Sequence, residues 1–141
     1  MKKNLLILIY LVAVTFILNL IWENLQMPLY TSYVWHAIWG INCVKASLGD
    51  ILIVLLMYIP IAVYKNKFAW FKNYTKTDII IFLGIGLLIA IGFEKFALAT
   101  NRWQYSSFMP IIPFINVGLS PILQMLILPF VTLKIVNTIT K

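Results

Sequence analysis

The chain of 141 residues is 62% hydrophobic and 11% charged, with a mean hydropathy of +0.96 and a formal net charge of +7. Soluble domains are about half apolar and about a quarter charged, so this composition excludes an ordinary soluble fold and points to a membrane protein. The positive residues are scattered singly and form no basic stripe, which argues against nucleic-acid binding. The single cysteine, Cys43, excludes an internal disulfide.

Four apolar runs are each long enough to cross a hydrocarbon layer of about 30 Å as a helix. The expected membrane spans are residues 5–26, 44–64, 77–100 and 117–136. No cleavage site follows the first run, so we interpret it as a retained span and not as a secretory signal. The chain is therefore predicted to be an all-α, four-transmembrane-helix bundle, with a single transmembrane domain over residues 1–141.

Two local signals refine these spans. Thr77 and Asp78 are expected to begin the third helix, because short polar residues favour helix starts. The proline-broken stretch 109–113 is expected to be an interfacial or re-entrant segment before the fourth span, and not helix.

Lysine and arginine positions predict the orientation. Eight lysines flank the side shared by the two termini and the middle loop, whereas Lys45, Lys95 and Arg102 flank the other side. Because cytoplasmic loops are enriched in Lys and Arg, both termini are expected in the cytoplasm, with the protein in the cell inner (plasma) membrane. Four tryptophans fit an aromatic belt at the outer side: Trp22, Trp35, Trp39 and Trp103.

A shift of the sequence by 71 places superposes the first predicted hairpin on the second. The shift pairs Glu23 with Glu94 and Leu48 with Leu119, although the identities are few. This pattern suggests two parallel hairpin repeats, with the two glutamates at the same depth.

Each predicted span carries polar or small residues at helical spacing toward its outer end. The four stripes are Thr15, Asn19, Glu23 and Gln26; Cys43, Ser47 and Asp50; Ala90, Glu94, Ala97 and Asn101; and Asn116, Ser120 and Gln124. Polar groups that face lipid lack hydrogen-bond partners, at a cost of several kcal/mol each. The stripes are therefore expected to face one another around a polar pocket that opens to the outside.

Acidic residues at membrane depth are functional candidates by default. Glu23, Asp50 and Glu94 are the candidate catalytic acids or bases, with Arg102 as a cation for an anionic group and His36 as a weaker candidate. The alternative is that these acids only form interfacial ion pairs with nearby cations and fix helix rotation. The candidate substrate-binding residues are Asn19, Gln26, Trp39, Asn101, Trp103, Tyr105, Asn116, Ser120 and Gln124.

No metal or cofactor is expected. One histidine and one cysteine among scattered acids match no zinc or iron spacing. Phosphate-loop, dinucleotide-binding and serine-hydrolase motifs are all missing from the sequence.

Several motifs resemble a family of small uncharacterised bacterial multipass membrane proteins. They are WENLQMPLY at residues 22–30, SLGD at 47–50, RWQY at 102–105 and GLSPILQ at 118–124. The resemblance covers most of the chain and implies that these motifs belong together, but it implies no activity. Trp103 and Tyr105 before a proline-rich span also resemble membrane carotenoid and terpenoid cyclases, although the acidic pair of those enzymes is absent here.

Three functions remain open at this point. The first is a membrane enzyme that uses the three acids in acid–base chemistry on a lipid or isoprenoid ligand. The second is a small proton- or cation-coupled transporter, against which the apolar inner half of the spans argues. The third is an accessory subunit that docks a membrane protein partner in a larger complex. The expected partners, which are the lipid bilayer and a second copy of the chain in a homo-oligomer, are compatible with all three hypotheses.

Overall fold

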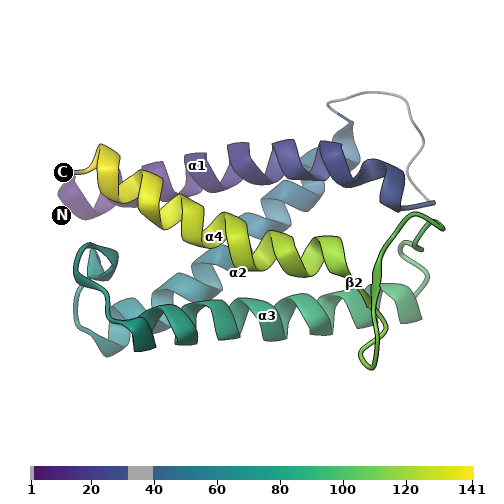
Figure 1. Ribbon diagram of the computed structural model, residues 1–141. Helices are drawn as coiled ribbons and strands as arrows, with labels where there is room; N and C mark the ends of the chain where they lie inside the picture. Colours follow the sequence, from purple (N-terminus) through teal and green to yellow (C-terminus); the bar gives the residue numbers. More distant parts are fainter. Residues whose placement is uncertain (1, 32–39) are drawn as a thin grey trace.

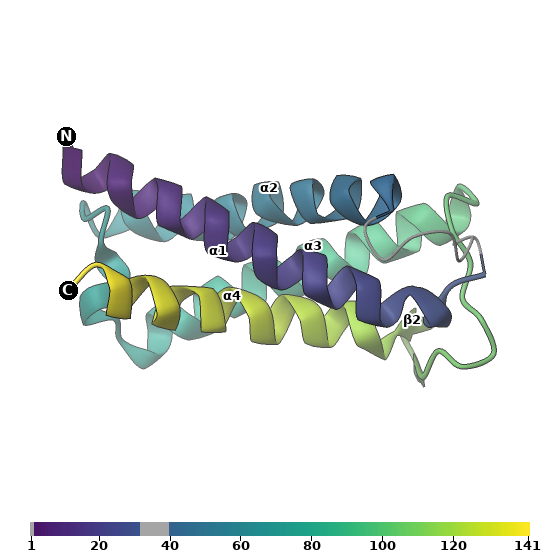
Figure 2. The same ribbon diagram turned by 90° about the horizontal axis from the view of Figure 1, so that it is seen from above.

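A computed structural model of the chain describes residues 2–31 and 40–141. These residues form four long helices: α1 (Lys2–Gln26), α2 (Ile41–Tyr64), α3 (Lys76–Ala99) and α4 (Leu119–Ile139) (Figures 1 and 2). Each helix is long and apolar enough to cross a membrane, and the helices pack against one another. The predicted all-α class and four-helix membrane bundle are thus confirmed, and the helices are those of a multipass membrane protein.

The helix bounds follow the predicted spans closely. α1 begins at Lys2 and α2 begins at Ile41, a little before the expected positions 5 and 44. α4 begins after its expected start because the preceding residues form a strand, β2 (Val117–Gly118). The described residues also include two short 3-10 helices: η1 (Met27–Leu29) and η2 (Trp70–Asn73).

The stretch before α4 is a small β-hairpin. β1 (Ile111–Ile112) pairs antiparallel with β2, with Ile111 opposite Gly118. Phe114 and Asn116 have positive φ angles of 75° and 53° in the turn between them. The proline-broken stretch is therefore non-helical, as expected, and the hairpin sets where α4 begins.

α3 begins one residue before the predicted helix start. Thr75 is its N-cap: the Asp78 backbone N–H donates to Thr75 Oγ1 at 3.2 Å, and the Thr75 backbone N–H donates to Asp78 Oδ2 at 2.7 Å. This reciprocal pair is a capping box, which satisfies backbone donors that the first helical turn leaves free. Lys65 Nζ also lies 2.5 Å from Asp78 Oδ2, so Asp78 joins the end of α2 to the start of α3.

An aromatic cluster fills the end of the bundle where Figure 1 shows both termini. The Trp70 ring lies 5.6 Å from the Tyr58 and Phe82 ring centroids, and the Tyr58 hydroxyl donates to the Phe68 carbonyl. Tyr58, Trp70, Phe71 and Phe82 are almost completely buried. Packing of these rings against α1 and α4 gives this half of the bundle an apolar core.

Candidate functional site

A cavity of about 730 Å³ lies in the half of the bundle away from the termini. All four helices and the segment after α3 contribute to its lining. The predicted site residues in the lining are Glu23, Gln26, Asp50, Glu94, Arg102, Trp103 and Gln124. Ligand pockets in proteins usually measure about 300–1,000 Å³, so the cavity is large enough for a small molecule or part of a lipid.

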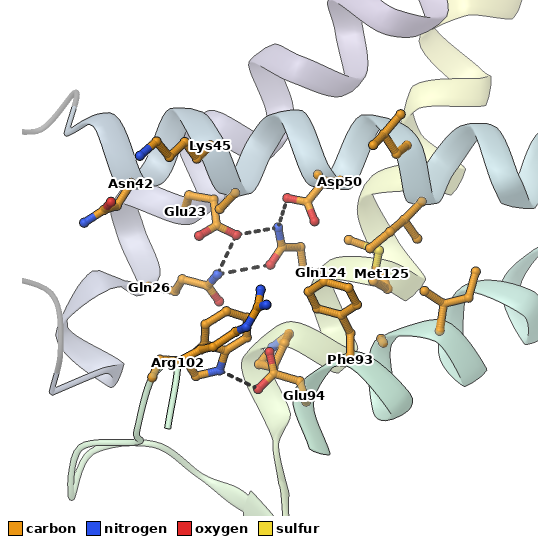
Figure 3. Close-up of a pocket in the computed structure, with 18 of the residues that line it drawn as sticks. Glu23, Gln26, Asn42, Lys45, Asp50, Phe93, Glu94, Arg102, Gln124 and Met125 are labelled. Atoms are coloured by element: carbon orange, nitrogen blue, oxygen red, sulfur yellow. Dashed lines mark hydrogen bonds between the residues drawn. The ribbon is translucent and has the colours of Figure 1, made fainter. Parts of the chain in front are cut away.

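Gln124, on α4, is the centre of the polar network in this cavity (Figure 3). Its Nε2 atom lies 2.9 Å from Glu23 Oε1 and 3.0 Å from Asp50 Oδ2, and therefore joins α1 and α2 to α4. The same nitrogen lies 2.9 Å from Asn19 Oδ1. An amide nitrogen carries only two hydrogens, so it cannot donate to all three oxygens at once. The network therefore has one more acceptor than this donor can serve.

Gln26 extends the network along α1. Its Nε2 atom donates to Glu23 Oε1 at 2.8 Å and to Gln124 Oε1 at 3.1 Å. Its Oε1 atom accepts from the Ser120 hydroxyl at 2.7 Å and from Trp22 Nε1 at 3.2 Å. These contacts satisfy several polar groups jointly where α1 packs on α4, as expected for polar side chains at membrane depth.

Glu94 faces this network from α3 and belongs to a second hydrogen-bonded group (Figure 3). Its Oε2 atom accepts from the Tyr105 hydroxyl and, at 3.3 Å, from Trp103 Nε1. The Tyr105 oxygen in turn accepts from the Gly118 backbone N–H at 2.9 Å. Burial, and then the hydrogen bond to Glu94, raise the pKa of Tyr105, so this phenol stays protonated and serves as a donor.

The three carboxyl groups share one geometric feature. Glu23 and Asp50 each accept hydrogen bonds through a single oxygen, and so does Glu94. In residues 2–31 and 40–141, no hydrogen bond reaches Glu23 Oε2, Asp50 Oδ1 or Glu94 Oε1. Among the described residues, each carboxyl group is thus held in place through one of its two oxygens.

Two cations also line the cavity, and neither is paired with these acids. Lys45 and Arg102 are exposed, and among the described residues the only ion pair joins Lys65 to Asp78. The Arg102 guanidinium lies 5.1 Å from the centroid of the Phe96 ring. The structure therefore does not show the alternative of interfacial ion pairs within the described residues. Neutral donors hold Glu23, Asp50 and Glu94 instead.

The other predicted site residues fall into three groups. Asn19, Ser120 and Tyr105 lie outside the cavity lining but bond directly to residues that form it. Asn101 and Asn116 are exposed at turns with positive φ angles of 54° and 53°, and the cavity lining does not include them. His36 and Trp39 lie outside the described residues.

The cavity also has apolar walls that sequence reasoning missed. Leu52 and Leu56 line it from α2, and Ile89 and Phe93 line it from α3. Each pair is spaced four residues apart, which places both side chains on one helix face. The same spacing occurs wherever a membrane helix faces lipid, so no sequence signal distinguishes these positions.

The described residues hold no group of three or more His, Cys, Asp or Glu side chains placed to bind a metal ion. The fold and the cavity define the chain as a four-helix membrane protein with a mixed polar and apolar pocket. Comparison with known proteins finds no family model, curated protein or solved structure that matches the chain.

Proposed function

We propose that the protein is a membrane enzyme that performs acid–base chemistry on a lipid or isoprenoid bound in the cavity. The observation that carries this proposal is the arrangement of the three carboxyl groups. Each is fixed through one oxygen by neutral donors, and its second oxygen has no hydrogen bond within the described residues. A general acid or base needs this combination of fixed position and free oxygen.

Glu23 and Asp50 are suited to act together. Both contact the same nitrogen of Gln124, so their carboxyl groups are near neighbours, and like charges at close range do not both ionise cheaply. In an acid–base reaction, one member of such a pair would give a proton and the other would accept one. Glu94 offers a third carboxyl group across the cavity, supported by Tyr105.

The apolar walls supply the reason for an amphiphilic substrate. Leu52 and Leu56 on α2 and Phe93 on α3 are substantially exposed, and they adjoin the polar network within the same cavity. A ligand with a polar end and a hydrocarbon chain would satisfy both parts of the lining. A small polar solute would leave the apolar walls without a partner.

The half of the bundle away from the cavity supports a closed binding pocket and argues against a transport path through the protein. The aromatic cluster around Tyr58 and Trp70 is buried there, together with Val54, Met57 and Leu133. A transporter needs polar groups along its path, and this cluster supplies few of them.

The proposal includes an orientation: inner membrane, both termini cytoplasmic, and the cavity in the outer leaflet. It follows from the lysine-rich ends of the spans. Lys67 and Gln104 are exposed at opposite ends of the bundle, after α2 and after α3 respectively. Each can therefore be replaced by cysteine in a Cys43→Ser background. A membrane-impermeant thiol reagent added outside should label position 104 and not position 67; the reverse labelling would overturn the orientation.

The acid–base function is tested by lipid extracts of cells that express the wild type, Asp50→Asn or Asp78→Asn, and of cells without the protein. Asp78 is the matched control because it caps α3 and pairs with Lys65 away from the cavity. The wild type and Asp78→Asn should change the amount of one amphiphile, and Asp50→Asn should not, at equal amounts of folded protein. Extracts that are the same with and without the protein would overturn the proposal.

A further inference from the structure

We infer that the cavity takes an amphiphile with an anionic head, such as a phosphate, which Lys45 and Arg102 hold, while its hydrocarbon chain lies against α2 and α3. This inference rests on the proposed function and names the substrate class for the same site. Its starting point is the separation of charge in the lining, where acids and bases share one cavity without pairing.

The two cations are the exposed charges of the cavity. Lys45 and Arg102 are exposed, whereas Glu23 is 7% exposed and Glu94 is 6% exposed. The two glutamates are therefore less accessible than the bases. A ligand that approaches the cavity meets positive charge first, and its next atoms reach the carboxyl oxygens.

Neutral donors explain why neither cation is paired with the acids of the cavity, and Arg102 contacts only the Phe96 ring among the described aromatic rings. Gln124 and Gln26 donate to Glu23, and Tyr105 and Trp103 donate to Glu94. These amide, phenol and indole groups satisfy the bonded carboxyl oxygens without using a base. The planar fork of Arg102 matches a phosphate or carboxylate in two hydrogen bonds, and a lysine adds a point charge.

The apolar walls continue from this head site. Leu52 is 63% exposed and Leu56 is 57% exposed on α2, and Phe93 on α3 is 48% exposed. Leu52 and Leu56 are one helical turn apart, so a chain that lies along α2 would contact both. The chain would pack against these side chains by van der Waals contact, and the charged head would supply the selectivity.

The test measures binding to the purified full chain in lipid nanodiscs, with farnesyl phosphate as the probe. Farnesol has the same chain without the charge, farnesylamine reverses the charge, and inorganic phosphate has the charge without the chain. The variants are Lys45→Gln and Arg102→Gln, with Lys95→Gln as the matched control. Lys95 is an exposed base next to Glu94 that does not line the cavity. Unchanged elution and circular dichroism show that each variant is folded.

Farnesyl phosphate should bind at least about fivefold tighter than farnesol, farnesylamine or inorganic phosphate. Lys45→Gln and Arg102→Gln should each remove most of this preference, and Lys95→Gln should keep it. Three results would overturn the anionic head but not the acid–base function. They are equal binding of farnesyl phosphate and farnesol, tighter binding of farnesylamine, or a loss in Lys95→Gln equal to that in the two cavity variants. Tight, cation-dependent binding with unchanged lipid extracts would support the anionic head and overturn the acid–base function. Equal binding of inorganic phosphate would overturn the part of the inference that concerns the chain.

Discussion

Replacing Gln124 by leucine should destabilise the bundle more than any other change of a single polar side chain in the cavity. Gln124 is 2% exposed, and its amide contacts Glu23, Asp50 and Asn19 while it accepts from Gln26. These partners lie on α1 and α2, so the side chain connects three of the four helices. Leucine keeps the volume but offers no donor.

The expected loss can be worked from these contacts. The Gln124 amide donates at most two hydrogen bonds at a time, and bonds between membrane helices are worth about 0.6 kcal/mol on average and up to about 1.7 kcal/mol. A half-buried carboxyl group such as Asp50 that loses its donor adds about 1–3 kcal/mol, and Asp50 has no other donor within the described residues. Together these terms predict a loss of about 2–4 kcal/mol in the free energy of unfolding.

The assay is unfolding of the purified protein in mixed micelles, followed by circular dichroism. Gln104→Leu is the matched control, because Gln104 is exposed and, among the described residues, its side-chain amide bonds only to the Asn101 side chain, at 3.3 Å. That change should alter the free energy of unfolding by less than about 0.5 kcal/mol. If Gln124→Leu were as mild as Gln104→Leu, the network would contribute nothing measurable, and the reasoning would be wrong.

Two further predictions concern packing and pH. A Cβ atom at Gly86 would lie 2.5 Å from Met57 Cε, whereas Gly84 has open space; Gly86→Leu should therefore lose about 1–3 kcal/mol of unfolding free energy, and Gly84→Leu should lose none. Equal effects at the two glycines in a thermal melt would contradict this packing. Burial and the bond to Glu94 raise the pKa of Tyr105 above its ordinary value of about 10. Its contribution to stability is thus complete below about pH 10 and is lost as the pH rises further, so Tyr105→Phe should show a smaller alkaline loss than the wild type. Identical losses in the two proteins between pH 9 and pH 11, where an ordinary phenol of pKa about 10 would titrate, would rule out this contribution.

The sequence was informative wherever a strong physical constraint acted on single residues. Length and hydropathy located the four spans, because only helices of about 20 apolar residues satisfy their backbone in lipid. The same constraint placed Glu23, Asp50 and Gln124 on inward faces, because a polar side chain that faces lipid lacks partners. The structure brings these three side chains into contact.

Other features depended on contacts that no periodicity reveals. Asn101 and Asn116 continue polar stripes in the sequence, but they lie in turns, where their positive φ angles are easily adopted by asparagine. Asp78 was expected at the start of the third helix and belongs to its capping box, but its contact with Lys65 depends on how α2 and α3 are connected. The apolar walls of the cavity carry the same residue types as lipid-facing helix surfaces.

The most direct test of a ligand-binding cavity is to fill it with a larger side chain without replacing any polar residue. Gly49 lines the cavity, and a Cβ atom there would have no neighbour within 4 Å, so Gly49→Phe should occupy the space. Gly92 on α3 is equally open but lies outside the lining, which makes Gly92→Phe the control. Native mass spectrometry of the purified proteins should find a bound amphiphile on the wild type and on Gly92→Phe, and none on Gly49→Phe. An amphiphile retained equally by Gly49→Phe would contradict the account.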